Sequence, residues 1–188
     1  MYIPSDPKLW EEIGQDKFLR KPRFWLPILV GLIIVYSTPE DIFQKLPFLN
    51  TLIGVVIDLI PSIGDWGERS KYPSATRILF SYFWIFLPYY TIMIFKSRLY
   101  EKNFVTGWLK KGKTRHLLPI INISFLMIFL LVYYFFVLPE SESCRFICLY
   151  KSKFIQLIYS FGATFSIAGL LASNLWWIKN FKKIHLSM

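Results

Sequence analysis

Hydrophobic residues in this chain are gathered into four long stretches. The stretches cover residues 24–38, 78–95, 117–138 and 154–178, and none contains an Asp, Glu, Lys or Arg side chain. Because lipid offers backbone amides no hydrogen-bond partners, an apolar stretch of about 20 residues crosses the hydrocarbon layer as a helix. The pattern therefore predicts an all-α integral membrane protein with a bundle of four transmembrane helices.

A fifth apolar segment, residues 46–63, is almost long enough to cross the bilayer as well. A span here would carry Asp58 into hydrocarbon at a cost of about 3 kcal/mol and would reverse the side of every later segment. On a helical wheel, the polar residues of this segment form one narrow stripe: Asn50, Thr51, Gly54 and Asp58. The apolar residues opposite include Leu49, Leu52, Ile53, Val56 and Ile60. We therefore expect an amphipathic helix that is interfacial or re-entrant, serving either as a packed cap on the bundle or as a receptor surface.

The first stretch is also compatible with a signal peptide, because its apolar core is short. It follows a long segment, residues 1–23, that contains four acidic residues, and this favours a retained span. Within residues 1–23, Leu9, Trp10, Ile13 and Phe18 are spaced to share one helix face. A short amphipathic helix is expected there, either lying on the headgroups or docking a partner.

Basic residues alternate between the segments that connect the stretches. Residues 1–23 carry five Lys and Arg residues, residues 96–116 carry seven, and the tail over residues 179–188 carries three. Residues 38–76 and residues 139–153 carry three each. By the positive-inside rule, both termini and residues 96–116 face the cytoplasm of a bacterial inner membrane, and the loops over residues 39–77 and 139–153 face the periplasm.

With 54% hydrophobic residues among 188, the chain has little material for a second domain, so we expect a single membrane domain over residues 1–188. No ionisable side chain lies inside a span, and no phosphate-binding loop, zinc-protease motif or nucleophile motif occurs. Ion pumps and proton relays need intramembrane charges. We therefore expect no enzymatic activity, no cofactor and no metal site.

The two cysteines, Cys144 and Cys148, both fall in the second periplasmic loop. An oxidising compartment favours a disulfide across this short turn, with free thiols and metal or redox chemistry as the alternatives.

The fourth span contains small residues spaced four apart. Gly162 pairs with Ser166, and Gly169 pairs with Ser173. Such spacing allows another helix to approach closely, either within the fold or from a second copy in a homo-oligomer. Asn122, Ser166 and Asn174 could also line the axis of a small oligomeric channel.

The middle segment, residues 96–116, is a basic hairpin with interleaved aromatic residues. Its candidate contact residues are Lys96, Arg98, Lys102, Trp108, Lys110, Lys111, Lys113 and Arg115. Anionic lipid headgroups, an acidic cytoplasmic protein and nucleic acid are the possible partners. We expect nucleic acid to be reached only indirectly, through a protein partner.

A small four-span chain with an apolar outer segment and a basic inner hairpin resembles two families at the level of architecture. One is the membrane subunit of the Kiwa anti-phage defence system, and this resemblance implies an oligomer that holds a soluble DNA-binding partner at the inner membrane. The other is the immunity proteins against pore-forming colicins. The expected function is a non-enzymatic sensor and anchor that recruits a cytoplasmic effector, with an immunity protein or a small channel as alternatives.

Overall fold

The computed structural model describes residues 22–97, 117–132 and 151–185, and all its regular elements there are helices. The elements are α2 (Pro22–Ser37), α3 (Ile42–Lys45), α4 (Pro47–Leu59), α5 (Ser62–Arg69), α6 (Pro73–Ile85), α7 (Leu87–Lys96), α9 (Leu117–Leu131) and α10 (Lys153–His185). The all-α prediction is confirmed for these residues.

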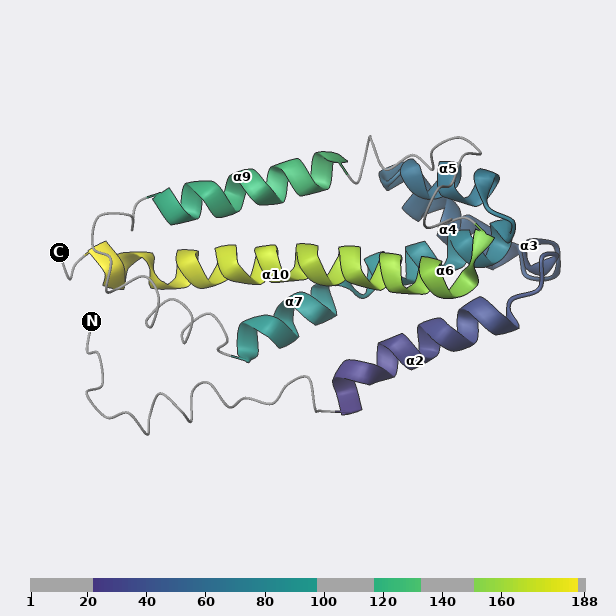
Figure 1. Ribbon diagram of the computed structural model, residues 1–188, viewed down its shortest axis with the longest axis horizontal. Coiled ribbons are helices and arrows are strands. Elements are labelled where there is room, and N and C mark those ends of the chain that lie inside the picture. Colours follow the sequence, from purple (N-terminus) through teal and green to yellow (C-terminus); the bar gives the residue numbers. More distant parts are fainter. Residues whose placement is uncertain (1–21, 98–116, 133–150, 186–188) are drawn as a thin grey trace.

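The longest helix, α10, is the element around which the others are arranged. It has 33 residues, about 50 Å at 1.5 Å per residue, and it contacts α2, α6, α7 and α9 along its length (Figure 1). Two stretches are long and apolar enough to cross a membrane, Pro73–Lys96 and Lys153–Lys179. Helix α2 and the described part of α9 are apolar but shorter.

Helices α6 and α7 together form the first of these long stretches, with a break at Phe86. Pro88 explains the break, because a proline has no N–H to bond the carbonyl four residues earlier and its ring crowds that carbonyl. The same rule applies to Pro27, which lies inside α2 without interrupting it. There the Tyr89 hydroxyl donates to the Arg23 carbonyl oxygen at 2.8 Å. This bond replaces the one that Pro27 cannot make and joins α2 to α7.

The segment between α2 and α6 leaves the bundle and returns to the same place. Helices α4 and α5, here called the hairpin, meet at an angle of 119°. The Ser74 hydroxyl donates to the Glu40 carbonyl oxygen at 2.7 Å, and the Ser74 amide donates to the Glu40 carboxylate at 3.3 Å. That amide is one of the unpaired donors in the first turn of α6, where a negative charge is favourable. Glu40 therefore caps α6 and closes the segment into a loop.

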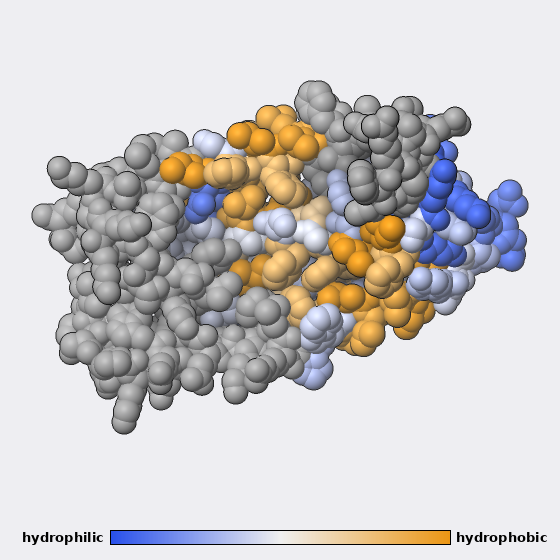
Figure 2. Space-filling model, viewed as in Figure 1, coloured by the Kyte–Doolittle hydropathy of each residue, from blue (hydrophilic) through white to orange (hydrophobic). Residues whose placement is uncertain are grey.

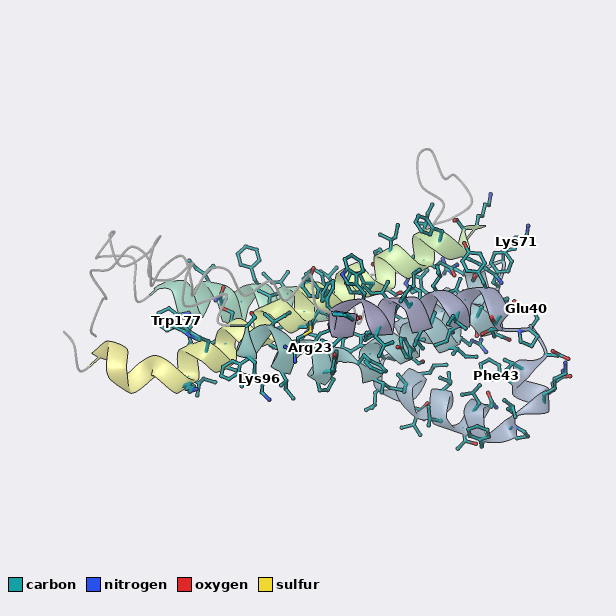
Figure 3. The ribbon with its side chains drawn as sticks, turned by 90° about the horizontal axis from the view of Figure 1, so that it is seen from below. Arg23, Glu40, Phe43, Lys71, Lys96 and Trp177 are labelled. Atoms are coloured by element: carbon teal, nitrogen blue, oxygen red, sulfur yellow. The ribbon has the colours of Figure 1, made fainter. Side chains whose placement is uncertain are left out.

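Figure 3 shows the two ends of the molecule. Glu40 and Lys71 lie at the hairpin end, whereas Lys96 and Trp177 lie toward the opposite end, here called the tail end. On the face drawn in Figure 2, hydrophobic residues cover the described middle of the molecule and hydrophilic residues gather at the hairpin end.

The core combines aromatic rings with a row of small residues on α10. Phe24 of α2 contacts Tyr90 of α7 and both Phe161 and Phe165 of α10 through edge-to-face rings. One row of small buried residues on α10 consists of Ser160, Thr164, Ala168 and Ala172, each at most 1% exposed. Their spacing of four follows one ridge of the helix, so neighbouring helices approach its backbone closely along several turns.

The start of α6 and the course of the segment over residues 46–63 differ from the prediction. The predicted second span begins at residue 78, whereas α6 begins at Pro73. The additional first turn contains the polar residues Ser74 and Thr76, which the structure nevertheless buries. The predicted helix over residues 46–63 is divided, since α4 ends at Leu59 and α5 continues from Ser62 to Arg69. Pro61 stands at the start of α5, a position that tolerates proline and that ends the preceding helix.

The buried row on α10 leads to a first testable prediction. Ala168→Leu should lower the free energy of unfolding by about 1–3 kcal/mol, because extra methyl groups do not fit a packed core. Gly162→Leu should cost nothing, since a side chain at Gly162 meets no atom within 4 Å. Thermal unfolding in detergent compares the two. An equal loss of stability in both variants would contradict the assignment of the packed row.

Candidate interaction surface

Helix α4 has three distinct faces. One is buried, with Ile53 only 3% exposed. The second carries large apolar residues that nothing in the described chain covers: Phe48 is 66% exposed, Leu52 47%, Val55 57% and Leu59 67%. The third is polar. Leu52 was predicted on the same side as Ile53 and instead lies in the exposed apolar stripe, because the buried face is narrower than the apolar arc of the helix.

The third face of α4 holds the polar residues of the predicted stripe. Asn50, Thr51 and Asp58 are exposed, and a side chain at Gly54 would meet open space. The apolar stripe and the polar face lie next to each other on the open side of α4. A helix with adjacent apolar and polar faces is suited to the boundary between hydrocarbon and water.

Helix α5 fixes the hairpin to the bundle through an aromatic stack. Trp66 is 2% exposed, and its ring centroid lies 5.6 Å from that of Phe80 in α6 and 5.5 Å from that of Tyr159 in α10. Such stacked pairs add about 1 kcal/mol beyond their area burial. The Trp66 ring thus joins three helices.

Gly67 permits the close approach of α5 and α6. A Cβ at this position would lie 2.5 Å from the Cγ and Nε atoms of Arg77, so the Arg77 side chain passes directly over the glycine. The Arg77 guanidinium reaches Glu68 at 3.7 Å. Any larger residue at position 67 displaces the Arg77 side chain from this path.

A ring of buried polar side chains joins the end of the hairpin to α6 and α10. The Thr76 hydroxyl lies 2.7 Å from the Ser70 hydroxyl and 2.9 Å from Oε1 of Gln156, and Nε2 of Gln156 donates to the Ser70 hydroxyl at 2.9 Å. Thr76 is 0% exposed and Gln156 1%. Because a hydroxyl both donates and accepts, the three side chains close a cycle in which each satisfies the others. We call this cycle the polar ring.

Next to the polar ring, aromatic rings hold a lysine at the start of α10. The Lys153 ammonium lies 4.6 Å from the centroid of the Tyr72 ring and 6.0 Å from that of Tyr36. Cation–π contacts of this kind are worth about 0.5–1 kcal/mol at exposed sites. They bring the C-terminal end of α2 to the segment that follows the hairpin.

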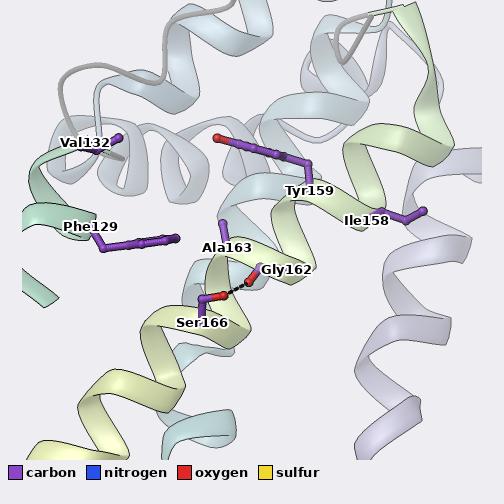
Figure 4. A pocket seen from close by; sticks show the side chains of 7 residues that line it. All are labelled: Phe129, Val132, Ile158, Tyr159, Gly162, Ala163 and Ser166. Carbon is purple, nitrogen blue, oxygen red and sulfur yellow. Dashed lines mark hydrogen bonds between the residues drawn. The ribbon is translucent and has the colours of Figure 1, made fainter. Parts of the chain in front are cut away.

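The predicted small-residue face of α10 lies elsewhere than the packed row. Gly162 and Ser166 line an open pocket between α9 and α10 (Figure 4), where the Ser166 hydroxyl donates to the Gly162 carbonyl oxygen at 2.8 Å. Farther along, Ser173 accepts a hydrogen bond of 2.6 Å from the Asn122 amide of α9. Gly169 also lies on α10, between these two contacts. Within the described chain, the Ser173 end of this face is the part that holds a neighbouring helix.

The three residues considered as a channel lining do not converge within one chain. Asn122 bonds Ser173, Ser166 bonds its own helix, and the Asn174 amide donates to the Leu170 carbonyl oxygen at 2.8 Å. Each of these polar side chains is thus hydrogen-bonded within the single described chain. Their alignment in an oligomer stays a prediction.

Most of the remaining predicted site residues lie outside the described residues. This applies to Cys144 and Cys148 and to the basic segment from residue 98 to residue 116. Lys96 is described, exposed at the last turn of α7. Beside it, the Lys179 ammonium lies 5.5 Å from the Phe95 ring, so α7 and α10 approach each other at the tail end.

Sequence reasoning missed the residues of the polar ring. Gln156 stands near the start of an apolar stretch, where a polar residue is normally taken to face water. A usable signal was present: Gln156, Ser160 and Thr164 are spaced four apart and continue into Ala168 and Ala172. That unbroken row over several turns marks the packed face better than the shorter pairs at Gly162 and Gly169.

Comparison with known proteins adds no relative. No protein-family model, no curated protein and no solved structure matches this chain.

The polar ring yields a second prediction. Thr76→Val keeps the shape of the side chain but leaves the buried Oε1 of Gln156 without the Thr76 hydroxyl that donates to it, so the free energy of unfolding should fall by about 1–3 kcal/mol. Thr51→Val is the matched control, because Thr51 is exposed and its hydroxyl donates to the Pro47 carbonyl oxygen of its own helix; a surface change of this kind costs about 0.5 kcal/mol or less. Thermal unfolding in detergent measures both. Equal melting temperatures would show that the ring contributes nothing.

Proposed function

We propose that this chain is a bacterial inner-membrane protein with four spans and both termini in the cytoplasm. It acts without enzymatic chemistry as a sensor and anchor. The hairpin lies in the periplasmic half of the bilayer, and the basic segment over residues 96–116 holds a cytoplasmic effector protein. The chain assembles as a homo-oligomer, in line with its resemblance to the membrane subunit of the Kiwa anti-phage system.

The membrane placement rests on exposed apolar side chains. They occur on the hairpin and also on helices outside it. Leu26 and Ile33 of α2 are each 61% exposed, Phe125 of α9 is 60% exposed, and Ile178 of α10 is 73% exposed. A water-soluble protein rarely leaves so many large apolar groups open on several helices. In hydrocarbon, exposure of these groups carries no free-energy penalty, because lipid does not hydrate them. This supports α2 and α9 as spans in addition to the two longer stretches.

The contact between Glu40 and Ser74 supports the proposed number of membrane crossings before the basic segment. Since the hairpin starts and ends at the same end of the molecule, α2 and α6 carry the chain in opposite directions with no further crossing between them. Lys96 and Lys179 then share the side of residues 96–116 and the tail, which together hold ten basic residues. The positive-inside rule makes that side cytoplasmic.

The single observation that carries the proposed role is the exposed apolar stripe of α4. The hairpin that bears this stripe packs against α6 and α10. A change in the lipid or in a partner that covers Phe48, Leu52, Val55 and Leu59 moves the hairpin. Trp66 and the polar ring connect the hairpin directly to α6 and α10. Because α10 runs unbroken to His185, a displacement at its periplasmic end reaches the tail. We infer that envelope disturbance is read at α4 and delivered to the cytoplasmic basic segment.

Recovery of the effector tests this proposal. Replacing the seven basic residues of residues 96–116 by Gln should lower recovery of a crosslinked cytoplasmic protein from native membranes at least about tenfold, a loss of about 1.4 kcal/mol in binding. The matched control replaces the periplasmic Lys45, Lys71 and Lys151 by Gln and should leave recovery unchanged. A C-terminal reporter that folds only in the cytoplasm verifies that orientation is retained.

Unchanged recovery in the first variant would remove the basic segment from the mechanism. If expression of this chain alone protected cells from a pore-forming colicin, the anchor role would be wrong and an immunity protein would replace it.

A further inference from the structure

Two lysines and two tyrosines meet where α2 ends and where α6 and α10 begin. The Lys153 ammonium, at the first residue of α10, lies 4.6 Å from the centroid of the Tyr72 ring and 6.0 Å from that of the Tyr36 ring. The Lys71 ammonium lies 5.8 Å from the same Tyr72 ring. We call these four residues the cation cluster. It gathers two positive charges around one aromatic ring.

The ammonium groups of the cation cluster keep their hydrogen-bond donors unused. A lysine ammonium has three N–H donors, and an aromatic face attracts its charge without supplying an oxygen acceptor. Among the residues that the structure describes, neither the Lys71 nor the Lys153 ammonium has an ion pair or a hydrogen bond. Three carboxylates of the hairpin end are bonded elsewhere: Glu40 to Ser74, Asp41 to Lys45 and Glu68 to Arg77. The cluster can therefore still bind an anion.

Exposed apolar side chains begin directly beside the cation cluster. On α2, Ile33 is 61% exposed one turn before Tyr36, which is itself 59% exposed. On α10, Phe154 directly follows Lys153, and both Phe154 and Ile158 are 54% exposed. The cluster thus lies where the polar hairpin end gives way to the apolar middle of the molecule. If α2 and α10 are spans, as in the proposed function on which this inference rests, this is the level of the lipid headgroups, where tyrosine rings and lysine ammoniums are typical.

The anion that a membrane presents at this level is the lipid phosphate. Its oxygens accept charge-assisted hydrogen bonds from an ammonium. In a zwitterionic headgroup, the lipid's own cation offsets this attraction. We propose that the cation cluster binds the phosphate of an anionic phospholipid in the periplasmic leaflet. Lys153 makes the main contact, Lys71 adds a second charge, and the two tyrosine rings hold the Lys153 ammonium at the headgroup level.

Photolabelling with two matched lipids tests the site. The full-length protein is placed in phosphatidylcholine nanodiscs with a small share of a photolipid whose diazirine lies in the acyl chain next to the glycerol backbone. The photolipid has either a phosphatidylglycerol or a phosphatidylcholine headgroup, and adducts are mapped by mass spectrometry. At Phe154 and Tyr36, adducts of the anionic probe should exceed those of the zwitterionic probe about fivefold, the effect of one basic residue near an anionic lipid.

Substitutions separate the cation cluster from general surface charge. Lys153→Gln should bring the two probes close to equality, and Lys71→Gln should lower the excess in part. Lys153→Arg should keep the excess, because charge and ring contacts remain. Lys45→Gln is the matched control: it removes the same charge at the hairpin end, but Lys45 is paired with Asp41 at 2.7 Å. It should leave the excess unchanged. Thermal unfolding verifies that each variant keeps its fold.

Four results would overturn the inference, and one of them also affects the proposed function. Equal labelling by the two probes would mean that the cluster selects no anion, and an equal loss in Lys45→Gln and Lys153→Gln would mean diffuse attraction. Loss of the excess with inorganic phosphate, but not with sodium chloride of equal ionic strength, would assign the cluster to a soluble anion. Absence of adducts from either probe at Phe154 and Tyr36 would reject the membrane placement, and with it the proposed function.

Discussion

The contact between Glu40 and Ser74 constrains the whole arrangement. It brings two points 34 residues apart in the chain to hydrogen-bond distance, so the apolar segment between them must turn back on itself. Were these residues at opposite ends of the bundle, α4 would be a span and every later segment would change sides. The orientation of the basic segment, and hence the proposed cytoplasmic role, depends on this closure.

The closure also accounts for the buried polar network at the hairpin end of the described chain. A segment that leaves the bundle and returns to the same place brings several helix ends together, and the backbone and side-chain groups buried there need partners. Ser70, Thr76 and Gln156 supply these partners to one another. Trp66 adds an apolar contact on the other side of the same junction. The hairpin is thus packed against α6 and α10 through these contacts and still presents one apolar stripe outward.

Sequence patterns predicted the helical class and the positions of the apolar stretches, because a long run of apolar residues without charge is typical of helices that lie in lipid. They failed where tertiary context decides. Ser74 and Thr76 are polar and were placed outside the second span, yet other chain segments bury them. On α10, small residues occur on two faces, and only the neighbouring helices determine that Thr164 and Ala168 pack while Gly162 stays open. Pro61 marked the bend, but the direction of the chain after it depends on Glu40, far away in sequence.

The most direct measurement of the central claim is the accessibility of single cysteines on either side of the hairpin. In a background of Cys144→Ser and Cys148→Ser, cysteines are introduced separately at the exposed positions Lys45 and Lys71, and cells with a permeabilised outer membrane are treated with a membrane-impermeant maleimide. The account predicts that both positions are labelled from the periplasm, whereas a cysteine at Lys96 is labelled only after the inner membrane is opened. Labelling of Lys45 and Lys71 from opposite sides would contradict it.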